Sequence, residues 1–172
     1  MGGADLAHAQ FEGADLRSTN LKKARLSDAK MPCACFYGAD LKDADFSSAD
    51  LRGACLIGAD NIPFWVNTDN LDYALMDERY FEEWKKQSDS EINPDIIWLS
   101  DDQESWKFRG EEYKKEDLVK ILVKEREETP SETKKYYLGF VIGTINHRNW
   151  KAVGPGGSYP IDIARVKPVW YY

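Results

Sequence analysis

Large apolar residues recur at every fifth position over the first third of the chain. The pattern begins at Leu6 and runs without a gap to Leu56. These central residues are Leu6, Phe11, Leu16, Leu21, Leu26, Met31, Phe36, Leu41, Phe46, Leu51 and Leu56. Because a fixed internal period is the signature of a repeat architecture, this pattern decides how the first sixty residues are interpreted.

A small residue stands two positions before each central residue. Ten of these eleven positions hold alanine, and the remaining one is Thr19. A period of five matches neither the 3.6-residue period of an amphipathic helix nor the alternation of an ordinary strand. The pattern therefore predicts a coiled backbone in which each five-residue unit turns one large and one small side chain inward.

The repeated unit reads Ala-Asp-Leu at residues 4–6, 14–16, 39–41 and 49–51. With this unit, residues 4–60 resemble the pentapeptide-repeat family. The resemblance implies a right-handed, quadrilateral β-helix with four repeats per turn, which gives about three coils here. It also implies that the central residues fill the core and leave no channel.

A turn of twenty residues would stack residues twenty apart at one strand spacing, about 4.8 Å. The residue before each central residue then points outward. The four predicted columns are Asp5/Arg25/Asp45, Gln10/Lys30/Asp50, Asn20/Asp40/Asp60 and Asp15/Cys35/Cys55. Two columns place opposite charges side by side, which favours this register modestly, as cross-strand pairs do.

The first coil begins at once, without a polar cap before it. Solenoids need polar caps to stay soluble. We therefore expect the open end of the first coil, with Leu6 and Phe11, to mediate self-association into a homo-oligomer or to bind a partner; the alternative is a sequence trimmed at its front.

The repeat loses its alanines after Asp60, and Phe64, Trp65 and Val66 are expected to cover the end of the last coil. Thr68-Asp69-Asn70 then form a run of helix-start residues. Behind them Tyr73, Met76, Tyr80 and Trp84 recur at helical spacing, which predicts a capping helix near 70–87. The five-residue register also continues through Leu71, Met76 and Phe81, so one more degenerate coil is the alternative.

The pattern of residues 90–172 predicts a small α+β domain, with one helix against an antiparallel sheet. We expect strands at 95–99, 105–108, 135–145, 149–153 and 161–172, a helix at 115–128, and a hairpin loop at 146–149. The predicted organisation is thus a pentapeptide-repeat β-helix at 1–66, a capping helix and linker at 67–89, and the α+β domain at 90–172.

The chain of 172 residues has a formal net charge of −7, unevenly distributed. Residues 61–133 carry −10, whereas residues 134–172 carry +5. The overall charge argues against general nucleic-acid binding. No apolar stretch is long enough for a membrane helix, and the three cysteines without a secretory signal indicate a reducing compartment, the cytoplasm.

The sequence offers no cofactor motif, phosphate-binding loop or catalytic signature. Cys33 and Cys35 do not predict a metal site, because their side chains would diverge and neither His8 nor His147 has a matching spacing. His147 is expected in an exposed turn. The glycine-rich stretch 154–157 precedes a predicted strand rather than a helix, so it does not predict a phosphate cradle.

Basic and aromatic residues alternate in the C-terminal segment, a combination suited to stacking on single-stranded nucleic acid or carbohydrate. The alternative is that these aromatics form the core of a small sheet. Four residues beside predicted loops are the candidates for partner binding, namely Arg148, Trp150, Lys151 and Tyr159.

The function that these features favour is a non-enzymatic protein-interaction or scaffold module, because solenoids present rigid, extended faces. A structural component of a larger assembly, such as a virion, is a variant of it. The family resemblance also implies a DNA-mimicking protector or inhibitor of DNA gyrase, although the repeat carries a net charge of only −2 and has an added domain. An enzyme with a catalytic α+β domain is the remaining alternative.

Overall fold

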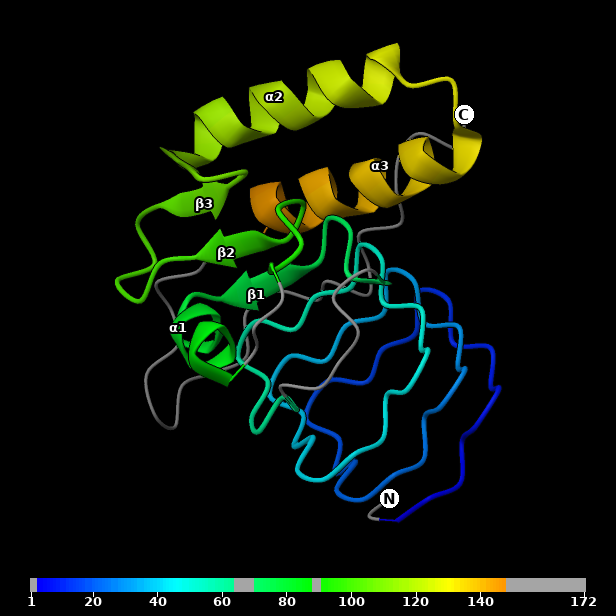
Figure 1. Cartoon of the computed structure of the whole chain (residues 1–172). Helices are drawn as coiled ribbons and strands as arrows, with labels where there is room; N and C mark the ends of the chain where they lie inside the picture. Colours follow the sequence, from blue (N-terminus) through cyan, green and yellow to red (C-terminus); the bar gives the residue numbers. More distant parts are fainter. Residues whose placement is uncertain (1–2, 64–69, 88–90, 148–172) are drawn as a thin grey trace.

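The computed structural model of the chain describes residues 3–63, 70–87 and 91–147. Figure 1 shows two parts: stacked windings of the N-terminal repeat, and above them a sheet and two long helices. The N-terminus lies at the far end of the windings from helix α2, Lys115–Glu128.

Parallel bridges join residues twenty apart along the whole repeat. They pair Asp5 with Arg25, Gln10 with Lys30, Asp15 with Cys35 and Asn20 with Asp40, and then Arg25 with Asp45, Lys30 with Asp50, Cys35 with Cys55 and Asp40 with Asp60. The four predicted columns are therefore confirmed. At one such bridge the Leu6 amide donates to the Arg25 carbonyl at 2.8 Å, and the Arg25 amide donates to the Ala4 carbonyl at 2.9 Å.

The core of the repeat consists of the central residues and the alanines. Every central residue from Leu16 to Leu56 is buried, as is every alanine at its repeat position from Ala24 to Ala59. The rings of Phe36 and Phe46 meet edge-on with their centroids 6.1 Å apart. Large and small side chains alternate in the interior and fill it, so the five-residue pattern in the sequence reflects how the core is packed.

Each five-residue unit turns its corner through a left-handed residue two positions after the central one. Lys23, Asp28 and Cys33 have φ values of 56°, 57° and 59° there, and Gly58 has 70°. Residues with a Cβ adopt this conformation at a cost, and glycine does so freely. Backbone hydrogen bonds between windings therefore hold several corners in a conformation that their side chains disfavour.

The ladder of windings continues beyond residue 60, so the helix expected near 70–87 is wrong over its first part. Cys55 bridges Leu75, and both Leu71 and Met76 are fully buried in the repeat core. The Leu51 amide donates to the Asn70 carbonyl at 3.0 Å, and the Leu56 amide donates to the Leu75 carbonyl at 2.8 Å. These bonds and the burial of the apolar residues outweigh the local helix-start signal. The alternative prediction, one more degenerate coil, is therefore correct for Leu71 and Met76.

Helix α1 is shorter than expected and spans Arg79–Gln87. Tyr80 and Trp84 are buried against the core of the last winding, and the Tyr80 hydroxyl donates to the Ala59 carbonyl at 2.9 Å. Phe64, Trp65 and Val66, which were expected to cover the same end, lie outside the described residues.

A four-stranded sheet grows directly from the last winding. Its strands are β1, Leu75–Asp77; β2, Ile97–Leu99; β3, Trp106–Phe108; and β4, Glu111–Tyr113, in the order β1-β2-β3-β4. The strands predicted at 95–99 and 105–108 are confirmed as β2 and β3, and β3 pairs with β4 in an antiparallel hairpin. The expected antiparallel sheet is mixed instead, because β1 continues the parallel ladder of the repeat and pairs with β2 in parallel.

Two helices, not one, pack beside this sheet in the described residues. Helix α2 has its predicted bounds, whereas the strand expected at 135–145 is wrong, because helix α3 spans Glu132–His147. Its residues Tyr137, Leu138, Val141 and Ile145 are buried at the spacing of one helical face. The expected hairpin loop at 146–149 is likewise wrong at its start, since Asn146 and His147 end α3. The strands expected at 149–153 and 161–172 lie outside the described residues.

Candidate functional site

Helix α3 covers one outer face of the repeat. On this face the outward column Asp15/Cys35/Cys55 changes from charged to apolar and continues into Leu75 and Ile97. A second hydrophobic core fills the junction, and it includes Cys35, Tyr37, Cys55, Ile57 and Leu75 from the windings and Leu118, Leu122, Leu138, Val141 and Ile145 from the helices. The repeat therefore uses a face as well as its interior for packing.

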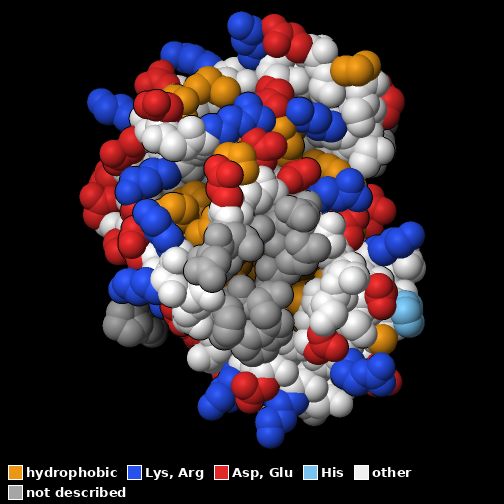
Figure 2. Space-filling model, viewed as in Figure 1, with side chains coloured by type: hydrophobic (Ala, Val, Ile, Leu, Met, Phe, Trp, Pro, Cys, Tyr) orange, Lys and Arg blue, Asp and Glu red, His pale blue; other side chains and the backbone are white. Residues whose placement is uncertain are grey.

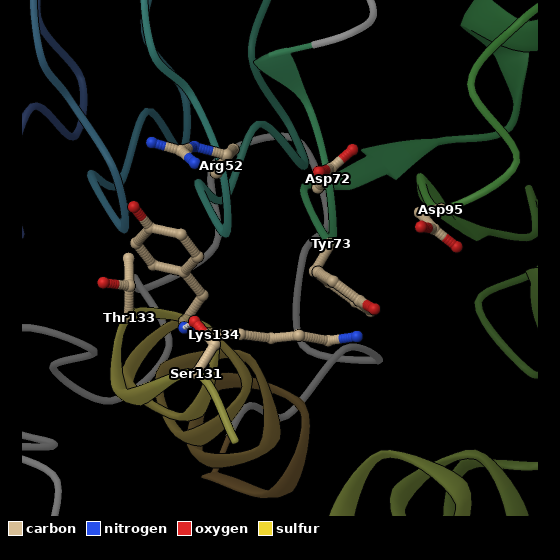
Figure 3. Close-up of a pocket in the computed structure, with 8 residues that line it drawn as sticks. Arg52, Asp72, Tyr73, Asp95, Ser131, Thr133 and Lys134 are labelled. Atoms are coloured by element: carbon tan, nitrogen blue, oxygen red, sulfur yellow. Dashed lines mark hydrogen bonds between the residues drawn. The ribbon is translucent and has the colours of Figure 1, made fainter. Parts of the chain in front are cut away.

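A pocket of about 450 Å³ opens at one edge of this junction. Figure 3 shows Arg52 and Asp72 on the windings at one side of the pocket, and Ser131, Thr133 and Lys134 at the start of α3 on the other side. Two other lining residues, Tyr73 and Asp95, lie on the side toward the sheet. Acidic and basic side chains thus share a single cavity between the two parts of the molecule.

Glu125 on α2 is the centre of the polar network beside this pocket. It accepts hydrogen bonds from the Tyr73 hydroxyl at 2.5 Å, from Lys134 Nζ at 2.8 Å and from the Arg109 guanidinium at 3.0 Å. Burial raises the pKa of Glu125, but these donors outweigh it and lower that pKa to about 2. Burial also raises the pKa of Tyr73 to about 12, so the hydroxyl remains a donor to the carboxylate at neutral pH.

Arg109 extends the network to the loop before β2. Its Nε donates to Asp95 at 2.6 Å, so one guanidinium joins that loop to Glu125 of α2. Lys134 adds a contact of another kind, since its ammonium lies 5.3 Å from the centre of the Tyr73 ring. Charge-assisted bonds of this kind are stronger than neutral ones, and here they tie the windings, the sheet and both long helices together.

The opposite wall of the pocket is fixed in the same way. Arg52 donates to Asp50 through Nε at 2.9 Å and Nη2 at 2.6 Å, and its guanidinium lies 5.1 Å from the centre of the Tyr137 ring. The hydroxyl of Ser131 accepts from the Lys134 amide at 3.2 Å and so caps α3. The lining cations are therefore already engaged by carboxylates, and the arrangement is that of a clamp holding α2 and α3 on the repeat.

The cysteines of the repeat are buried thiols. Burial raises the pKa of Cys33, and the nearby Glu12 and Asp50 raise it further. Because the thiolate is the reactive form, this cysteine stays protonated and inert at neutral pH.

The residues predicted from the sequence as binding sites lie elsewhere. Arg148, Trp150, Lys151 and Tyr159 are outside the described residues, and their role stays a prediction. Leu6 and Phe11 are partly buried against the repeat core, whereas Leu26 and Met31 in the next winding are fully buried. The clamp at Glu125 was missed, although the apolar outward pair Cys35 and Cys55 could have indicated a covered face.

No helix in the part of the chain that the structure describes is long and apolar enough to cross a membrane.

A family model described as pentapeptide repeats matches residues 1–31 and 34–60 with 8 copies. No curated protein matches the chain. Among solved structures, a pentapeptide repeat protein from the Arabidopsis thaliana thylakoid lumen is 30% identical, with 43% of this chain and 55% of that chain covered and a TM-score of 0.27. A pentapeptide repeat protein from Nostoc Pcc 7120 is 32% identical, with 43% and 69% covered and a TM-score of 0.22.

QnrB1, a plasmid-mediated fluoroquinolone resistance protein, is 19% identical, with 51% of this chain and 43% of that chain covered and a TM-score of 0.32. The chain thus spans about half the length of the Arabidopsis protein and of QnrB1. The family model covers the repeat that the central residues define, and the chain belongs to the pentapeptide-repeat family.

Proposed function

We propose that this chain is a non-enzymatic protein-interaction module built on a right-handed, quadrilateral β-helix. Pentapeptide-repeat proteins fold as right-handed β-helices and are typically structural or binding proteins. The quadrilateral section is supported by the bridges, which recur every twenty residues and so allot four five-residue units to each winding. Such a solenoid holds its outer side chains at fixed spacings on a rigid frame.

The observation that carries the proposal is the covered face of the repeat. One outer face already binds a helix, because α3 packs on Tyr37, Ile57 and the two stacked cysteines. The neighbouring face, with Lys22, Lys42 and Asp43 exposed, keeps the same backbone ladder and differs only in its side chains. A frame that binds a helix of its own chain on one face is suited to binding another protein on the next.

The charges of the exposed faces favour a protein partner over nucleic acid. Arg25 lies between Asp5 and Asp45 in its column and donates to Asp5 at 2.8 Å, and Lys22 pairs with Asp40 at 2.9 Å. Acidic and basic side chains are also interspersed over the face drawn in Figure 2. A mixed surface of this kind resembles neither a basic nucleic-acid site nor the acidic surface expected of a DNA mimic.

We also propose that the first winding self-associates through Leu6 and Phe11, which are less buried than the residues stacked on them. Changing Leu6 to Asp should abolish the oligomer in sedimentation experiments at unchanged secondary structure. An oligomer that persists in this variant would contradict self-association at this end. The buried thiols support a reducing compartment such as the cytoplasm.

The test of the interaction function is capture of partners by the tagged full chain, with and without nuclease, followed by mass spectrometry. We expect a nuclease-resistant protein that is lost when Lys22 and Lys42 on the exposed face are both changed to Glu. The matched control changes Lys120 and Lys124 of α2 to Glu and should retain the partner. Loss of every partner after nuclease treatment would contradict the proposal.

A further inference from the structure

A second and larger hollow, of about 680 Å³, lies between α1 and the turn that joins β3 to β4. Its third side is the segment 91–94 before β2. We call this hollow the α1 groove. It lies on the side of the sheet toward α1, whereas α2 and α3 pack with the opposite side. The α1 groove is a separate feature from the clamp around Glu125.

The floor of the α1 groove is aromatic. The Phe81 ring meets the Trp98 ring edge-on with centroids 5.2 Å apart, and the Trp84 ring also meets Trp98 edge-on, with centroids 6.0 Å apart. Trp98 is only 6% exposed, while Phe81 and Ile92 are partly buried on the same cluster. Rigid aromatic surface of this kind is typical of the centre of a binding site.

Cations already stack on the aromatic rings of the groove. The Lys85 ammonium lies 5.8 Å from the centre of the Phe81 ring, and the Arg109 guanidinium lies 4.5 Å from the centre of the Phe108 ring. Such contacts are favourable because the ring face carries negative charge. The groove is therefore chemically suited to a basic side chain with an apolar stem.

The carboxylates at the rim point to the same kind of ligand. Of the basic residues in the wall, Lys107 is paired with Glu78, and Arg109 is paired with Asp95 and Glu125. Within the described residues, Glu82 and Glu91 have no ion pair. After these pairings, two carboxylates and the Lys85 ammonium remain, so the charge available to a ligand is acidic.

We propose that the α1 groove binds an extended, basic peptide segment of a partner protein. An arginine or lysine of the peptide lies along the groove with its charge beside Glu82 and Glu91, and an adjoining apolar residue packs on Ile92. An acidic segment would place its carboxylates against the same two glutamates, so it is disfavoured. This inference rests on the proposed interaction function and names a second binding surface, apart from the repeat face with Lys22 and Lys42, together with the chemistry of its ligand.

The test uses the full chain and a labelled peptide of three Arg-Pro-Leu repeats, with binding followed by fluorescence anisotropy. Two comparison peptides replace Arg by Glu, or Pro-Leu by Gly-Ser. We expect the Arg-Pro-Leu peptide to bind about tenfold more tightly than either, because it alone carries both features. Binding should weaken when salt rises from about 50 to about 300 mM.

Matched variants locate the site. Changing Glu82 and Glu91 together to Gln should weaken binding about fivefold, since each exposed charge pair contributes little on its own. The control changes the exposed Glu127 and Glu128 of α2 to Gln and should leave binding unchanged. The indole N–H signal of Trp98, assigned with a Trp98→Phe variant, should shift when the peptide binds.

The inference is overturned if the Glu82→Gln/Glu91→Gln variant binds the Arg-Pro-Leu peptide as wild type does, or if the Glu-Pro-Leu peptide binds equally well. Partner capture separates this failure from that of the interaction function. If the wild-type chain captures a nuclease-resistant partner but fails the peptide tests above, the groove alone is overturned. Partners that all disappear with nuclease overturn the interaction function itself.

Discussion

The windings and the helical part of this molecule are stabilised by different kinds of order. In the windings, the position of a residue within its five-residue unit decides whether it is inward, outward or at a corner, as Phe36, Arg25 and Lys23 illustrate. In the helical part, burial depends on contacts between distant segments, such as the bond from Tyr73 to Glu125 across 52 positions. A substitution in the windings should therefore have an effect set by its place in the unit, and one in the helical part an effect set by its partners.

The largest effect is expected from a charge inside the windings. Changing Phe36, which is fully buried against Phe46, to Asp buries a carboxylate without a partner. We expect a loss of stability of about 4 kcal/mol or a failure to fold, measured as the urea midpoint of the far-ultraviolet circular dichroism signal. Changing the exposed Lys42 to Asp is the control and should cost less than about 0.5 kcal/mol. Equal midpoints for the two variants would show that Phe36 is not inward.

The next largest effect should come from the clamp. Changing Glu125 to Ala removes the acceptor shared by three donors, and we expect a loss of about 3 kcal/mol. Hydrogen exchange should rise in α3 and stay low in the windings, because the bonds between windings do not involve Glu125. Glu128→Ala, at a side chain that is 67% exposed, should change neither quantity. Faster exchange throughout the windings would contradict the separation of the two parts.

The pH dependence of stability should report on the same carboxylate. The pKa of Glu125 in the folded chain is about 2, below its ordinary value of 4.5, so its contribution is present above pH 4.5 and is lost as the pH falls toward 2. The gap in unfolding free energy between wild type and Glu125→Gln should narrow over that window, because a protonated Glu125 resembles glutamine. A gap that stays constant from neutral pH down to about pH 2 would contradict the ionised clamp.

A corner substitution should have a smaller effect that depends on its surroundings. A Cβ added at Gly58, where φ is +70°, would lie 2.7 Å from the Tyr37 ring, whereas one at Gly13, where φ is +64°, meets only the Tyr136 hydroxyl at 3.7 Å. We expect Gly58→Ala to cost about 3 kcal/mol and Gly13→Ala about 1 kcal/mol in denaturant unfolding, the difference being the clash. Equal costs would mean that backbone strain alone decides both.

The smallest effect should be a gain. Lys23 has a φ of 56°, which glycine adopts without penalty, so Lys23→Gly should raise stability by about 0.5 kcal/mol in the same unfolding measurement. Its neighbour Lys22 lacks a positive φ, and Lys22→Gly should lower stability instead. If both changes lower stability, the corner at Lys23 is not strained.

The repeat could be predicted in detail from the sequence because its order is local. Central residues, alanines and outward columns all follow from a period of five, and the bridges confirm the columns. The same register predicted, as an alternative, that Leu71 and Met76 are central residues of one more coil. The helix-start residues before them favoured a helix there instead, which is wrong. Only burial in the last winding distinguishes the two possibilities.

The helical part was harder to predict for physical reasons. Residues 135–145 are rich in tyrosine, valine and isoleucine, which favour strands in general, yet the covered face of the repeat selects the helix because one stripe of α3 fits it. The clamp has no local signal, since Tyr73, Arg109, Glu125 and Lys134 come from four separate segments.

The outward column that runs from Asp15 through Cys35, Cys55 and Leu75 into Ile97 also constrains how the length of this protein can vary. An insertion of twenty residues within the repeat adds one complete winding and leaves the apolar column beneath α3 unbroken. An insertion of five residues shifts the later part of the column onto the adjoining face, where its neighbours are charged. Evolution can therefore lengthen this chain by whole windings, whereas a single added five-residue repeat would move the apolar column away from the helices that pack on it.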